Sequence, residues 1–106
     1  MKHSVRNLVA ATAAKEIAGE SLHELVDCTY AEVVPIARVL AAERRLDDAR
    51  LLITFPDEER VSLTVHEDVF RGWDHQSGYF FAGAVYESNL LLFDGQDRRY
   101  YQYQIH

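Results

Sequence analysis

The sequence predicts an α+β fold, in which two or three N-terminal helices pack on a C-terminal, mostly antiparallel sheet of five strands. Two observations carry this prediction. Apolar residues recur at helical spacing up to about residue 48, and from residue 49 onward they alternate with a period of two. Residues 54–106 also hold 11 of the 12 aromatic residues, a residue class that is enriched in strands. Helices followed by strands is the element order of an α+β domain.

The chain length predicts a single domain. A chain of 106 residues can enclose one hydrophobic core but not two. We therefore take residues 1–106 as one globular domain, with a helical part at 1–48 and a sheet part at 49–106. No run approaches the ~20 apolar residues of a membrane span. The N-terminal apolar run is interrupted by Thr12 and Lys15, which favours a first helix over the alternative of a secretory signal.

The first helix is predicted to bury one apolar stripe, made of Val5, Leu8, Val9, Ala13 and Ile17. Arg6 and Asn7 then lie on the solvent side, and Gly19 ends the helix.

Capping boxes predict where two further helices begin. Ser21 with Glu24, and Thr29 with Glu32, have the spacing at which a side-chain oxygen and a glutamate satisfy the first turn of a helix. Pro35 either starts or kinks the third helix. That helix buries the side chains of Ile36, Val39, Leu40 and Leu46.

Five strands are predicted from alternation and turn residues, at residues 50–55, 61–66, 79–86, 90–93 and 99–105. Short turns between them require antiparallel pairing. In the second strand, Leu63 and Val65 point into the core, while Thr64 and His66 point out.

No chemical motif predicts an enzyme. The histidines lack the close spacing of metal ligands, and their densest cluster with carboxylates is His66, Glu67, Asp68, Asp74 and His75, around Trp73. Cys28 follows Asp27 at the end of the predicted second helix, which disfavours a reactive thiolate. A lone cysteine suits a cytoplasmic protein. We therefore predict no catalytic residue, no metal and no cofactor.

Charge and aromatic content favour protein binding. A net charge of −6 opposes direct nucleic-acid binding, and turn carboxylates beside surplus aromatic residues are typical of a surface for a basic protein partner. The predicted partner-binding residues are Asp57, Glu58, Glu59, Glu67, Asp68, Trp73, Asp74, Tyr86 and Tyr100.

The predicted function is a small acidic module that acts as a stoichiometric inhibitor or adaptor. In size and charge the chain is similar to small acidic inhibitors such as toxin-immunity proteins and phage-encoded blockers of bacterial defence nucleases. One alternative is a small-ligand binder or enzyme with a pocket near His66, Trp73 and His75. Another alternative is a structural subunit that forms a homodimer through its sheet.

Overall fold

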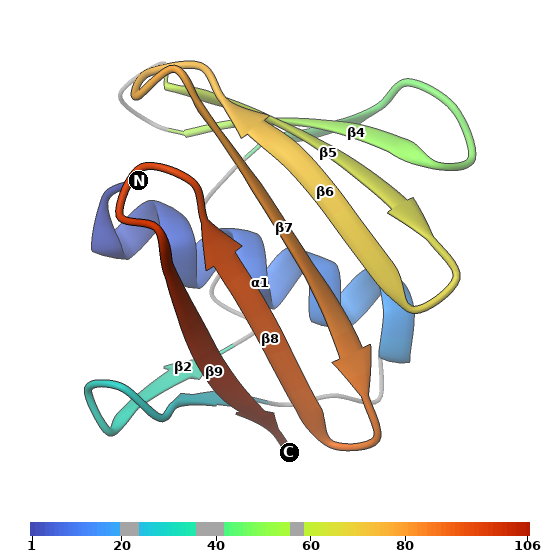
Figure 1. Cartoon of the computed structure of the whole chain (residues 1–106). Helices are drawn as coiled ribbons and strands as arrows, with labels where there is room; N and C mark the ends of the chain where they lie inside the picture. Colours follow the sequence, from blue (N-terminus) through green and yellow to red (C-terminus); the bar gives the residue numbers. More distant parts are fainter. Residues whose placement is uncertain (20–23, 36–41, 56–58) are drawn as a thin grey trace.

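The computed structural model describes residues 1–19, 24–35, 42–55 and 59–106 (Figure 1). Within these residues, one helix is followed by nine strands. The elements are α1 (His3–Ala18), β1 (Glu24–Asp27), β2 (Glu32–Pro35), β3 (Ala42–Arg45), β4 (Arg50–Thr54), β5 (Arg60–His66), β6 (Val69–Asp74), β7 (Tyr79–Tyr86), β8 (Asn89–Asp94) and β9 (Arg99–Ile105).

All nine strands form one antiparallel sheet in the order β2-β1-β9-β8-β7-β6-β5-β4-β3. Strands β3 to β9 follow one another as a meander, and the β1–β2 hairpin pairs with β9. The sheet curls around α1, which touches β1 and β2 from one end of the sheet and β5, β7 and β8 from the rest. Figure 1 shows α1 behind β7 and β8, with β4 to β6 on one side and β9 and β2 on the other.

The prediction of two or three helices on five strands is wrong. The predicted second helix overlaps β1, and the predicted third overlaps β2 and β3; its part at residues 36–41 lies outside the described residues. Leu25 and Val34 are cross-strand partners packed against the core. The backbone N–H of Thr29 donates to Asp27 Oδ1 at 3.0 Å, so the apparent capping residue belongs to a hairpin turn.

The sequence prediction also missed strand β6, although the five predicted strands are present as β4, β5, β7, β8 and β9. Gly72 weakens the strand signal of this segment. In the structure the glycine is needed, because a Cβ there would lie 2.3 Å from the ring of Phe81, its cross-strand partner. Phe70 covers Gly83 in the same way. These reciprocal aromatic–glycine pairs pack β6 and β7 closely against each other.

Helix α1 is buried on most of its surface, because the sheet surrounds it. Its alanines, Ala10, Ala11, Ala13 and Ala14, are all buried. The prediction that Arg6 and Asn7 face solvent is wrong, since only 2% and 7% of these residues are exposed. The helix ends before Gly19, whose φ of 95° any other residue would adopt with strain. Among the described residues, no helix is both long and apolar enough to cross a membrane.

Each of three hairpin turns begins after a buried aspartate that ends the preceding strand. Asp27, Asp74 and Asp94 end β1, β6 and β8, and in each the side-chain Oδ1 accepts the N–H two residues on, at 3.0–3.1 Å. Because these three strands run in the same direction, the aspartates lie at one end of the sheet. The N-terminal amine of Met1 lies 3.3 Å from Asp94. At this end of the core, Asp94 and Asp27 each lie beside a cation, the Met1 amine and the Arg6 guanidinium.

Candidate functional site: the outer face of the sheet

The outer face of the sheet, opposite α1, is open to solvent. Strand alternation turns Leu63, Phe81 and Tyr101 inward, and their neighbours outward. The prediction is confirmed for Leu63, which is 1% exposed, and for His66, which is exposed. Thr64 and Val65 are both half-buried, and Val65 packs against the core.

Four outward aromatic side chains form a row across β6, β7, β8 and β9. We call Trp73, Phe80, Phe93 and Tyr100 the aromatic row. Trp73 and Phe80 are cross-strand partners, and so are Phe93 and Tyr100. Ring centroids lie 5.9 Å apart for Phe80 and Phe93 and 5.0 Å apart for Phe93 and Tyr100. Trp73 is 45% exposed, Phe80 51% and Tyr100 66%. Side chains of this size at this exposure are available to a partner.

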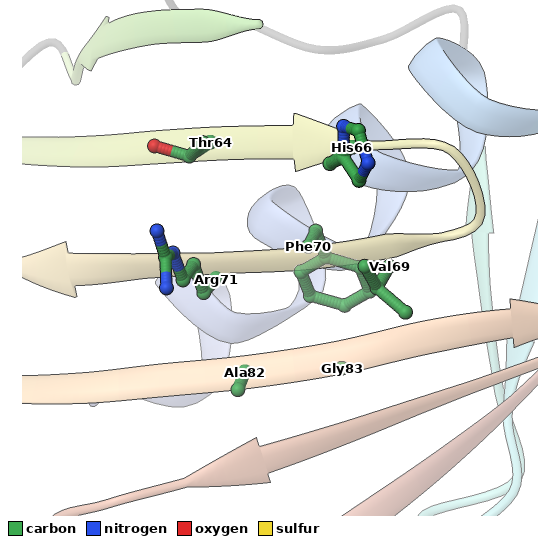
Figure 2. A pocket seen from close by; sticks show the side chains of 7 residues that line it. All are labelled: Thr64, His66, Val69, Phe70, Arg71, Ala82 and Gly83. Carbon is green, nitrogen blue, oxygen red and sulfur yellow. The ribbon is translucent and has the colours of Figure 1, made fainter.

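Two adjoining hollows of about 430 and 510 Å³ lie beside the aromatic row, over β5, β6 and β7. Both are lined by Thr64, Arg71 and Ala82, which are aligned across the three strands. Figure 2 shows the first hollow, with Thr64 and His66 on β5, Arg71 on β6 and Ala82 on β7. The hollow forms because Ala82 offers only a methyl group between larger neighbours.

Arginine side chains occupy the other half of the outer face. We call Arg44, Arg50, Arg60 and Arg71, on β3 to β6, the arginine group; their registers place all four on the outward side. Arg50 is paired with Asp47, with Nε 2.7 Å from Oδ2. Among the described residues, no carboxylate lies within ion-pair distance of Arg44, Arg60 or Arg71. None of the outward positions of β4 to β9 is acidic.

A serine and a histidine meet at the edge of the hollows. Ser62 Oγ lies 2.7 Å from His75 Nε2, which is the contact that a nucleophile and its base make. Among the described residues, no carboxylate is hydrogen-bonded to the other nitrogen of His75. The backbone N–H groups of β5 and β6 are engaged in strand pairing, so this part of the sheet has no donor pair for an oxyanion. Within the described part of the chain, the pair is a hydrogen bond between two side chains with no third side chain hydrogen-bonded to it.

A second polar cluster lies inside the fold, between α1, β1 and β9. Tyr103 donates its hydroxyl proton to Asn7 Oδ1 at 2.7 Å and accepts from Arg6 Nε at 3.3 Å. The guanidinium of Arg6 lies 3.7 Å from Asp27 Oδ2 and 3.7 Å from the ring centroid of Tyr101. The cluster therefore compensates a buried carboxylate with a buried cation.

One group of possible metal ligands belongs to this inner cluster. Nitrogen or oxygen atoms of His3, Asp27 and Glu32 lie within 4.8 Å of one another. However, Arg6 Nη2 lies 2.7 Å from His3 Nδ1 and 3.7 Å from Asp27 Oδ2, so a cation of the chain already lies beside two of the three groups. His3 Nε2 also contacts Glu32 Oε2 at 2.8 Å. His3 and Glu32 are exposed, while Asp27 Oδ2 is buried beside the Arg6 guanidinium without a hydrogen-bond partner among the described residues.

The surroundings in the inner cluster shift the pKa values of Arg6 and Tyr103. Burial acts to lower the pKa of Arg6, but the hydrogen bond to Tyr103 and the negative charge of Asp27 together raise it above its ordinary value. Burial also raises the pKa of the Tyr103 hydroxyl well above that of a free tyrosine. Arginine and tyrosine are protonated in the physiological range even without these shifts, so the hydrogen bonds from Arg6 to Tyr103 and from Tyr103 to Asn7 connect α1 to β9 throughout it.

The predicted partner-binding residues that the structure describes do not form one continuous site. Trp73, Tyr86 and Tyr100 lie exposed on the outer face. Glu67 and Asp68 form the exposed β5–β6 turn.

The other carboxylates differ in their surroundings. Glu59 is paired with Lys2, and Asp74 is buried in its turn. Asp57 and Glu58 lie outside the described residues. Cys28 is exposed in the β1–β2 turn rather than at a helix end.

The sequence prediction did not include Phe93 and the arginine group in the binding surface. For Arg71 a signal exists, since Val69, Arg71 and Trp73 alternate with Phe70 and Gly72. The glycine and the polar residues of this segment weaken that signal.

Comparison with known protein families, curated proteins and solved structures finds no match to this chain. The interpretation of the outer face therefore depends on its own geometry.

Proposed function

We propose that this protein is a binding module that acts by stoichiometric association with another protein, as an inhibitor or an adaptor. The observation that carries the proposal is the aromatic row, exposed on the face of the sheet that α1 does not cover. Aromatic side chains grouped in this way are the residues that dominate the binding energy of protein interfaces.

The fold itself gives no reason for this exposure. The core is completed on the inner face by α1 and by the buried aromatic residues Phe70, Phe81, Tyr101 and Tyr103. Leu91, on the outer face between the aromatic row and Tyr86, is also exposed. Contiguous apolar surface of this kind marks an interaction site more often than a free surface. A protein partner would remove it from water.

The test is a binding titration with alanine variants. The partner is captured from the native host, purified, and titrated against wild type, Trp73→Ala and Phe80→Ala. Each variant is expected to weaken binding by roughly 2 kcal/mol or more, about 30-fold, if these residues are anchors. Tyr79→Ala is the matched control, because Tyr79 is 47% exposed and lies next to Phe80 but has the inward phase of β7. Unchanged affinity in both anchor variants would contradict the proposal.

The homodimer alternative makes a different prediction for the same surface. A second copy covering the aromatic row would make the molecular mass depend on concentration, and Trp73→Ala would abolish that dependence. Sedimentation of the wild-type chain alone separates this alternative from binding to another protein.

The small-ligand alternative is favoured by the hollows beside His66 and Trp73 and by the Ser62–His75 contact. A ligand in the hollows would depend on the small side chain of Ala82, so Ala82→Leu would block it. Ala82 is the cross-strand partner of Phe93, so the separating variant is Tyr100→Ala, at a residue that lines neither hollow. Tyr100→Ala should weaken a protein partner and leave a ligand in the hollows bound.

A further inference from the structure

We infer that the partner surface that docks on the outer face is an acidic protein segment that also carries apolar side chains. This inference rests on the proposed function and adds the chemistry of the partner. Its basis is the charge distribution of the outer face, which is opposite in sign to that of the whole chain.

The charge of the chain is distributed unevenly over its surfaces. The net charge is −6, yet the outward positions of β4 to β9 hold Arg50, Arg60, Arg71 and His66 and no carboxylate. Carboxylates of this half of the molecule lie in turns, such as Glu67 and Asp68, or are buried, such as Asp74 and Asp94. A ligand on the face therefore meets cations and aromatic rings first.

Three arginines are free to pair with a ligand. The guanidinium groups of Arg44, Arg60 and Arg71 have no ion-pair partner among the described residues, whereas that of Arg50 is held by Asp47. Arg71 lies between Thr64 and Ala82 across the strands and lines both hollows. In Figure 2 its side chain stands beside the hollow on the open side of the sheet. A carboxylate entering the hollow would be placed for a bidentate contact with Arg71.

The expectation of a basic partner depended on turn carboxylates. A basic partner remains a prediction for the turns at the ends of the sheet, where those carboxylates lie. On the outer face itself, charge complementarity favours the opposite sign.

The arrangement of charges and rings favours a protein segment over a nucleic acid. The arginine group lies on β3 to β6 and the aromatic row on β6 to β9, so the two are side by side rather than interleaved. Single-stranded nucleic acid carries a phosphate beside every base, and its binding sites mix cations with stacking rings. The net charge of −6 also repels a polyanion at long range. An acidic stretch followed by apolar anchors fits the segregated pattern.

Trp73 provides a reporter for the test, because it is the single tryptophan of the chain and lies where the two halves meet. The probes are three ligands without tryptophan or tyrosine. They are a 12-residue peptide that repeats Glu-Phe-Asp-Leu, its counterpart with Lys at every acidic position, and a 12-nucleotide oligothymidine. Trp73 emission is recorded during titration at low and high salt.

The inference predicts saturable binding of the acidic peptide that weakens with salt, since exposed charges are screened. Arg60→Glu with Arg71→Glu should weaken it by about tenfold or more. Arg98→Glu is the control that reverses a charge in the exposed β8–β9 turn, two or more strands away from Arg60 on β5 and Arg71 on β6, and should leave binding within about twofold. Stronger binding of the lysine peptide or of oligothymidine, or no binding of any probe, would overturn the inference.

The purified partner of the proposed function separates the two claims. If Trp73→Ala abolishes partner binding but the double arginine reversal does not, the outer face binds a protein whose contacting surface is not acidic. If neither variant affects partner binding, the proposed function itself fails.

Discussion

Arginine side chains have opposite surroundings on the two faces of the sheet. On the inner face, Arg6 is enclosed by Tyr101, Tyr103 and Asp27, so its charge is compensated within the fold. On the outer face, Arg71 stands in solvent with no carboxylate partner among the described residues. The comparison teaches that the buried arginine has a structural role, whereas the exposed one is available for binding.

The largest expected effect on stability comes from removing the Arg6 cation beside the buried Asp27. Arg6→Met should lower the free energy of unfolding by about 3–5 kcal/mol, because it leaves the carboxylate of Asp27 buried without a cation. Urea unfolding measures this. The double variant Arg6→Met with Asp27→Asn should recover part of the loss, since Asn removes the charge and keeps the oxygen that holds the turn. A single-variant loss below about 1 kcal/mol, or no recovery, would contradict the structural role.

A glycine on the inner side of the sheet gives the next largest effect. Gly83→Ala should cost about 1–3 kcal/mol, because the new Cβ would lie 2.3 Å from the ring of Phe70 and 2.2 Å from the carbonyl oxygen of Leu91. The outward neighbour provides the control, since Ala84→Ser should change stability by about 0.5 kcal/mol or less. Thermal unfolding of both variants measures the difference. Equal stability of the two would mean that β6 and β7 are less closely packed than the structure shows.

The buried hydroxyl of Tyr103 on the inner face gives a third, smaller effect on stability, which also depends on pH. Tyr103→Phe removes the hydroxyl between Arg6 and Asn7 and should cost about 1–2 kcal/mol near neutral pH.

Burial raises the pKa of Tyr103 in the folded state, so its contribution is complete below the ordinary tyrosine pKa of about 10 and is lost as pH rises above it. Unfolding free energies measured from pH 8 to pH 11 should fall more steeply for wild type than for Tyr103→Phe. Parallel curves would contradict the burial of this hydroxyl.

The smallest effect is expected at the Ser62–His75 contact on the outer face. Ser62→Ala should change stability by about 0.5 kcal/mol or less, because the hydrogen bond is exposed. It should also leave any slow hydrolysis of an activated ester unchanged, since the pair lacks a carboxylate partner for His75 among the described residues. Loss of a measurable esterase activity in Ser62→Ala would favour the enzyme alternative.

The sequence predicted the strands better than the helices, for a physical reason. In β5 and β9 only one face is buried, so apolar and polar residues alternate and identify the strand. Strand β1 is four residues long, too short to show a period, and its turn residues resemble helix caps. Tertiary pairing of Leu25 with Val34 and Ile105 decides its structure.

The buried side of α1 was hard to predict because the sheet encloses the helix. A polar residue such as Arg6 is normally placed on the solvent side of an amphipathic helix. Its partners, Asp27 and Tyr103, are 21 and 97 residues away in the chain and give no local signal. The sequence could predict that some aromatic residues are exposed, because one face of the sheet cannot bury so many rings. It could not predict that they form one row, because that depends on the register between strands.

The central claim is that the outer face binds a partner while the inner face holds the fold together. The most direct measurement uses protein in which the single tryptophan, Trp73, is replaced by 5-fluorotryptophan, so that one fluorine signal reports on the outer face. Saturating the protein with the purified partner should shift or broaden this signal strongly, and Arg98→Glu should behave as wild type. An unchanged fluorine signal in a fully formed complex would contradict the claim.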